Sequence, residues 1–208
     1  LFFYQQEERW VLNDVPNDIL SVLPSYDYRL AYLIEFDAES PGERVSAEDV
    51  LSPVPSSFFF SSGAGGWYTD LSLYEDGSFS GSFRDYDLGG GDGKYERGVC
   101  YACDFTGSFE DFRRVSEDTY SMRLKDLTYL YGDGEEWDED GTHFIPWDAC
   151  GISGGDLFYL FYKGHDLSTL PREFRDWMRV KIGAEENGKL GIYGIFNLSE
   201  KAGFAGIM

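Results

Sequence analysis

Apolar and polar residues alternate along much of the chain, and the clearest alternation lies in its second quarter. Trp67, Leu71 and Leu73 share one face, and after a turn Phe79 and Phe83 resume that face. A period of two places successive side chains on opposite faces, so this segment predicts two strands with one buried face each. We expect Trp67, which begins the apolar face, to be a packing anchor.

The turn between these two strands follows from the parity of the pattern. A two-residue loop would pair Leu73 with a serine and set a core position against a solvent position. A three-residue loop with Gly77 in the left-handed conformation pairs Leu73 with Phe79 instead, and we predict this longer turn. The same register places Gly81 opposite Leu71 and leaves space there for a large neighbour or a ligand.

Further strands are predicted along the rest of the chain. Residues 99–109 and 120–131 alternate, with a slip of phase near Asp126 that is typical of a β-bulge. The segment from Leu157 to Tyr162 is apolar throughout, which indicates a strand covered on both faces. Residues 190–198 alternate again and predict the last strand.

A short helix is predicted near the C-terminus, where Pro171 begins it and Phe174, Trp177 and Met178 share a face. Short strands joined by short turns predict a mostly β fold, an antiparallel meander that forms a β-barrel or a sandwich.

The first part of the chain differs from the rest. We expect a short helix at 13–23, a strand at 28–36 and a capped turn at Ser46, followed by a proline-containing joint. These features predict an N-terminal extension over residues 1–55 and a barrel-like domain over residues 56–208.

Composition and charge narrow the function classes. The chain has 208 residues, of which 42% are hydrophobic and 18% aromatic, so a packed core is expected. The net charge of −21 argues against direct binding of nucleic acid or anionic membranes, because both need Lys and Arg. The charge is compatible with binding of cations or basic proteins, or simply with a well-solvated exterior.

We expect no membrane insertion, since no apolar run approaches the roughly 18 residues that span a bilayer. Leu1 is not an initiator Met, so the sequence leaves open whether a signal peptide was removed.

The three cysteines are Cys100, Cys103 and Cys150. The first two have the C-x-x-C spacing of zinc and redox sites, which need both sulfurs on one side of the chain. Side chains three positions apart in a strand point to opposite faces, so the predicted strand would separate the two sulfurs. We therefore predict a buried Cys103, a chemically neutral Cys100 and no bond between them.

Three features bear on catalysis, and none of them completes a catalytic site in the sequence. Residues 151–155 match G-x-S-x-G, the nucleophile elbow of hydrolases, but a predicted strand follows where the elbow needs a helix. We predict a glycine-rich turn. His143 and His165 are too few for a histidine-rich metal site. A catalytic pair of carboxylates, as in glycosidases, stays an open alternative, because such a pair is defined by its separation in space and the sequence does not give that distance.

The segment from Asp85 to Glu96 offers cation ligands at a meaningful spacing. Asp85, Asp87 and Glu96 match positions of a calcium loop, although Gly89 stands where Asp or Asn is usual. Calcium is the one cofactor that the sequence suggests, and the alternative is a flexible, solvated connection. A second acidic stretch at 133–140 could also hold cations or be a solvated charge run.

The chain resembles an uncharacterised family of mainly Gram-positive bacterial proteins that are often secreted or lipid-anchored. The matching segments are Phe60-Ser-Ser-Gly-Ala-Gly-Gly-Trp67, Asp76-Gly-Ser-Phe-Ser-Gly81, Asp104-Phe105, Thr119-Tyr-Ser-Met122, Leu170-Pro171 with Trp177, and Tyr193-Gly-Ile-Phe-Asn197. This resemblance covers about residues 58 to 204 and implies an extracellular or cell-surface location, with a cytoplasmic one left open. It implies no activity.

A weaker resemblance is to the calycins, the lipocalin and avidin barrels. Gly65-Gly66-Trp67 has the G-x-W form that opens such barrels. It implies a barrel and no particular ligand residues.

Three function hypotheses follow. The first is a non-enzymatic binding or interaction module, with an unknown small ligand or a basic protein as its partner. The second is an acidic inhibitor or nucleic-acid mimic that occupies a basic protein site. The third is a hydrolase with paired carboxylates. An apolar cavity inside the barrel would favour a ligand carrier, and carboxylates clustered on one face would favour an inhibitor.

Overall fold

The computed structural model describes residues 3–6, 9–12, 42–63, 66–130, 135–179, 181 and 183–207. The helix predicted at 13–23 and the strand predicted at 28–36 lie outside these ranges. Strands β1 (Phe3–Gln6) and β2 (Arg9–Leu12) pair as an antiparallel hairpin.

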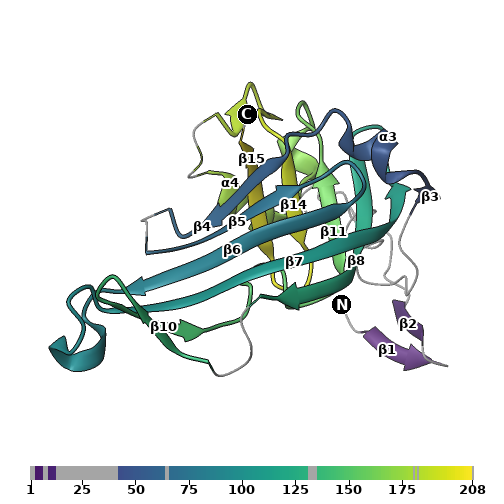
Figure 1. Cartoon of the computed structure of the whole chain (residues 1–208). Helices are drawn as coiled ribbons and strands as arrows, with labels where there is room; N and C mark the ends of the chain where they lie inside the picture. Colours follow the sequence, from purple (N-terminus) through teal and green to yellow (C-terminus); the bar gives the residue numbers. More distant parts are fainter. Residues whose placement is uncertain are drawn as a thin grey trace.

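Eight antiparallel strands close into a barrel in chain order (Figure 1). They are β4 (Ser57–Ser61), β5 (Trp67–Leu73), β6 (Ser78–Asp87), β7 (Val99–Arg114), β8 (Thr119–Tyr129), β11 (Leu157–Phe161), β14 (Gly194–Asn197) and β15 (Ala202–Ile207). Each strand pairs with the next, and β15 pairs back with β4. Closure gives every barrel strand a partner on both sides. The predicted β meander is therefore a barrel and not a sandwich.

The β5–β6 hairpin has the predicted turn. Leu73 pairs with Phe79 and Leu71 pairs with Gly81. Gly77 has a φ of 86°, the left-handed conformation that the three-residue loop requires. The space opposite Leu71 is occupied by a large neighbour, because the ring of Phe105 on β7 lies against Gly81.

The predicted β-bulge is also present. Between β7 and β8 the register moves from Ser108 opposite Asp126 to Phe109 opposite Leu124. Lys125 is the extra residue on β8, next to the position where the sequence pattern changes phase. The bulge lets apolar residues on both sides of it face the core.

Aromatic side chains fill the interior of the barrel. The ring centroids of Phe79 and Phe109 are 4.8 Å apart, and those of Phe109 and Phe158 are 5.0 Å apart. Phe60 and Phe204 form a further pair at 5.1 Å. All five side chains are at most 3% exposed. In the described part of the barrel, these side chains belong to one packed interior core.

A second apolar cluster covers part of the outside. After η2 (Leu167–Thr169), helix α4 (Arg172–Met178) lays Phe174 against Phe161 of β11 and Phe196 of β14, at 5.0 and 5.8 Å. All five residues of β11 are buried, so the prediction of a strand covered on both faces is confirmed. The predicted helix near the C-terminus is confirmed as well.

The prediction of the last strand was wrong. Within residues 190–198, only Gly194–Asn197 is a barrel strand, while Leu190 belongs to β13 (Lys189–Leu190), which pairs with β12 (Glu185–Glu186). The last strand is β15, whose sequence Ala-Gly-Phe-Ala-Gly-Ile has low strand propensity. Its small residues have a packing reason, because a Cβ at Gly203 would lie 3.0 Å from the Cβ of Trp177 on α4.

The residues before β4 pack onto the barrel. Strand β3 (Glu43–Arg44) pairs with the end of β7, and α3 (Ala47–Leu51) buries Val50 and Leu51 in the interior cluster. The Oγ of Ser46 accepts a hydrogen bond from the Asp49 amide at 3.1 Å, which is the predicted cap. The division into an extension over residues 1–55 and a barrel domain stays a prediction. Within the described part of that extension, residues 42–55 contribute apolar side chains to the barrel core.

Strands β6 and β7 continue beyond the barrel and carry a projection at the lower left of Figure 1. Their connection contains η1 (Gly90–Gly93). Strand β10 (Thr142–Pro146) adds to β7 in parallel, and β9 (Trp137–Glu139) pairs with β10. This projection contains most of the charged positions that the sequence singled out.

Candidate functional site

The G-x-S-x-G segment forms a turn that is tied to the barrel. The amides of Gly151 and Gly154 each donate to one carboxylate oxygen of Glu200, and the Gly151 bond measures 2.6 Å. The buried Asn197 side chain donates to the Gly151 carbonyl oxygen at 3.0 Å. Strand β11 follows, starting at Leu157, so the predicted glycine-rich turn is confirmed and the helix of a nucleophile elbow does not follow it.

Both imidazoles are bound to groups other than this turn. His165 is buried, and its Nδ1 and Nε2 lie 2.8 Å from oxygens of Asp118 and Thr169. His143 lies between two carboxylates, with Nδ1 2.7 Å from Asp138 and Nε2 3.1 Å from Glu136. Each histidine therefore joins neighbouring segments of the chain.

The cysteines lie as the alternation predicts. Cys103 belongs to the interior cluster, whereas Cys100 is buried on the other face of β7 and pairs in register with Phe144 of β10. All three cysteines are free thiols. Burial raises the pKa of Cys103 to about 12 and that of Cys150 to about 11. Such thiols are almost fully protonated near neutral pH, which disfavours nucleophilic and metal-binding roles.

The calcium candidates lie at the base and on the connection of the projection. Asp85 and Asp87 are on β6, and Glu96 follows η1. One oxygen of Asp87 accepts the Gly89 amide at 3.0 Å. Among the residues that the structure describes, no three His, Cys, Asp or Glu side chains form a group suited to a metal ion. Calcium binding by this loop stays a prediction.

The projection brings the two acidic stretches of the sequence together. We call residues 84–98 and 135–146 the acidic arm, which contains nine Asp and Glu against three Lys and Arg. The parallel pairing places His143 opposite Val99, and the Arg97 amide donates to the Gly141 carbonyl at 2.9 Å. The sequence suggested two separate loops. A parallel pairing across about 40 residues leaves no local signal that could have joined them.

Aromatic stacking stiffens the acidic arm. The ring of Tyr95 lies on His143 with centroids 4.4 Å apart and planes 4° apart. Trp137 and Phe144 stack at 4.8 Å and 6°. The first stack holds β10 against the connection between β6 and β7, and the second stack joins β9 to β10, as do the carboxylates bonded to His143. The arm therefore presents its charges from an ordered surface.

The arm also exposes apolar side chains. Leu88 is 80% exposed and Tyr86 is 40% exposed, and nearby Trp147 is 56% exposed. Tyr86, Leu88 and Phe144 line an open pocket of about 600 Å³, together with carboxylates that include Glu96. Exposed aromatic and aliphatic groups beside carboxylates are suited to contact with a partner that is both basic and apolar. The sequence pattern indicated the acids of this surface but not its exposed aromatic side chains.

Comparison of the chain with protein-family models, curated proteins and solved structures gave no match. Within the described ranges, every helix is too short or too polar to span a membrane.

Proposed function

We propose that this protein is a non-enzymatic interaction module of a bacterial cell-surface or secreted protein, and that its acidic arm binds a basic region of a partner protein. The observation that supports this proposal is the joining of two acidic stretches into one ordered projection with exposed Leu88 and Tyr86. The aromatic packing of the barrel interior disfavours the other option, a carrier with an apolar internal cavity.

The charge of the arm explains how such a partner would be recognised. An excess of six negative charges on a projection attracts Lys and Arg side chains over about a Debye length, roughly 8 Å at physiological salt. Apolar contacts with Leu88 and Tyr86 would then add short-range affinity that salt does not screen. We therefore expect binding that weakens with salt without vanishing.

A binding experiment with a defined probe tests this function. The probe is a lysine-rich peptide containing two leucines, compared with a peptide in which serines replace the leucines. The test variant combines Glu135→Gln, Glu139→Gln and Asp140→Asn, all at exposed positions of the arm. The control combines Glu48→Gln, Glu75→Gln and Glu117→Gln, which are exposed and outside the arm.

Both variants change the net charge equally, so they separate the arm from the overall charge of the chain. We expect the arm variant to lose at least about tenfold in affinity and the control less than about twofold. Leu88→Ser should weaken only binding of the leucine-containing peptide. Equal losses in the two triple variants would mean that binding follows total charge, and the assignment to the arm would be wrong.

A second candidate function is an acidic inhibitor that occupies a basic site on its partner. It is favoured by Glu139 and Asp140, two exposed acids at the end of the β9–β10 hairpin. If the site on the partner normally binds nucleic acid, a short DNA duplex should compete with this protein for it. If this protein competes with the duplex and the arm variant does not, the inhibitor hypothesis is supported. If the partner binds this protein and the DNA at the same time, the hypothesis is excluded.

A further inference from the structure

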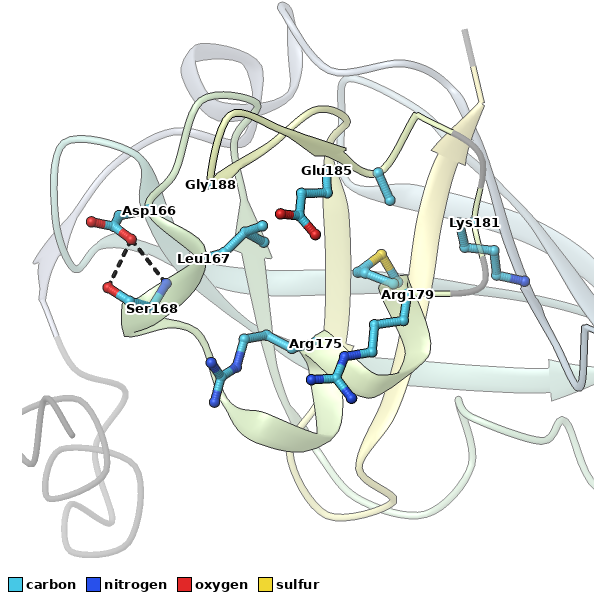
Figure 2. A pocket seen from close by; sticks show the side chains of 10 residues that line it. Asp166, Leu167, Ser168, Arg175, Arg179, Lys181, Glu185 and Gly188 are labelled. Carbon is cyan, nitrogen blue, oxygen red and sulfur yellow. Dashed lines mark hydrogen bonds between the residues drawn. The ribbon is translucent and has the colours of Figure 1, made fainter. Parts of the chain in front are cut away.

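A pocket on the outside of the barrel is separate from the acidic arm. It lies between η2, α4 and the β12–β13 hairpin and has a volume of about 460 Å³ (Figure 2). Arg175 of α4 and Arg179, the C-cap of this helix, extend along one side of it, and the Glu185 carboxylate lies on the opposite side. The pocket therefore has walls of opposite charge.

The first wall contains an arginine whose guanidinium forms no ion pair with a described residue. The Nε of Arg175 is buried and makes no hydrogen bond, and no described residue forms an ion pair with its guanidinium. A buried donor without an acceptor is unfavourable, so this group favours a ligand that supplies an acceptor. Arg179, one helical turn away, contacts Asp176 at 3.4 Å and its side chain is 77% exposed. It has donors left for a ligand.

The second wall contains a carboxylate that no described residue pairs with. Glu185 is exposed on β12, where its backbone pairs with Leu190, and its carboxylate forms no ion pair or hydrogen bond with the residues that the structure describes. The other acid of the pocket, Asp166, is engaged, because its Oδ1 accepts both the amide and the hydroxyl of Ser168 at 2.9 and 2.8 Å (Figure 2). Lys181 is also engaged, since its Nζ donates to Ser61 at 2.8 Å.

Arg175 and Glu185 thus line one pocket and do not neutralise each other. The rigid elements that hold them, a helix and a two-residue β-ladder, keep the groups on opposite sides. A ligand with a carboxylate at one end and an ammonium at the other would pair with both. Leu167, Met178 and Ala184 supply apolar surface between them.

We propose that this pocket binds a small zwitterion, a free amino acid or a short peptide, whose carboxylate contacts Arg175 and Arg179 and whose ammonium contacts Glu185. A guanidinium matches a carboxylate with two parallel hydrogen bonds, which gives orientation as well as affinity. The apolar lining favours an aliphatic side chain. The site is independent of the arm, so either proposal can fail without the other.

Calorimetry with blocked ligands tests the site without altering the protein. The probes are L-leucine and the dipeptide Ala-Leu, compared with N-acetyl-L-leucine, which has no ammonium, and L-leucinamide, which has no carboxylate. We expect at least one free zwitterion to bind and both blocked leucines to bind at least about tenfold more weakly than L-leucine, or not at all. Binding of Ala-Leu without L-leucine would identify a peptide site. No heat from either zwitterion at millimolar concentration would overturn the proposal.

Substitutions then assign the two walls. Arg175→Gln and Glu185→Gln should each weaken zwitterion binding at least about tenfold, and Arg175→Lys should restore part of the loss. The controls are Arg172→Gln, on the same helix with a side chain 74% exposed, and Glu186→Gln, next to Glu185; neither residue lines the pocket. Melting curves confirm folding of each variant. Equal losses in test and control variants would show that the pocket is not the site.

Discussion

The ring of Phe105 on β7 lies directly over Gly81, its cross-strand neighbour on β6. A Cβ built at Gly81 would stand 2.5 Å from the Cζ of this ring. The relationship is repeated two residues along in the opposite sense, where the ring of Phe79 covers Gly107 and a Cβ there would lie 2.4 Å from it. Each strand thus supplies a glycine where the other supplies a phenyl ring, and the two strands interlock inside the barrel.

This interlock makes Gly81 sensitive to a single added methyl group. Gly81→Ala should destabilise the protein by about 1–3 kcal/mol, because the Cβ would meet both the Phe105 ring and the Asp70 carbonyl oxygen at 2.3 Å. Urea unfolding measures the loss. Gly66→Ala is the control, since no described residue lies within 4 Å of a Cβ built there. Equal midpoints for the two variants would contradict the close packing.

The turn at 149–155 should loosen when Glu200 is replaced. Glu200→Ala removes the acceptor of the Gly151 and Gly154 amides, and a hydrogen bond to a charged group contributes about 1.5–3 kcal/mol. Glu200→Gln keeps one acceptor oxygen and should cost less. Hydrogen exchange at the two glycine amides gives a local measurement. Unchanged exchange in Glu200→Ala would mean that the carboxylate does not hold the turn.

Trp67 packs against the core, as predicted, but it is half-buried and not fully enclosed. The centroid of its ring lies 4.8 Å from that of Phe60 and 6.1 Å from that of Trp177 of α4. Trp67→Ala should therefore cost less than the about 3–5 kcal/mol of a fully buried Trp. A double-mutant cycle with Trp177→Leu should give a coupling of about 0.5–1.5 kcal/mol. Additive losses would show that the two rings do not stabilise each other.

Stability should fall in alkaline solution. The pKa of Cys103 is raised to about 12 and that of Cys150 to about 11, from an unfolded value near 9.0, because burial disfavours the thiolate. Below pH 9 the two protonated thiols make their full contribution to the free energy of unfolding. This contribution is lost as the pH rises toward their pKa values in the folded protein, because the thiols of the unfolded chain ionise first. Urea midpoints at pH 8 and 10.5 measure the change, which should be smaller in Cys150→Ala. Equal changes in both proteins would exclude a contribution from this thiol.

The sequence by itself determined the local parts of the fold. The alternation around Leu73 and Phe79 set the register of the β5–β6 hairpin, because a short turn and a period of two allow only one pairing that keeps both residues in the core. The slip near Asp126, the covered strand β11 and the helix starting after Pro171 follow from patterns of the same short range.

Only the tertiary structure decided which distant segments meet. Strand β15 has too many Gly and Ala residues for its pattern to be recognised, and it is a strand because β4 and β14 pair with it while α4 needs its small residues. The acidic arm depends on a parallel pairing between β7 and β10, and the α4 pocket on the separation of Arg175 from Glu185. The strand pairings join remote positions and the separation of Arg175 from Glu185 is a relation in space, and the local alternation of a chain contains no information about either.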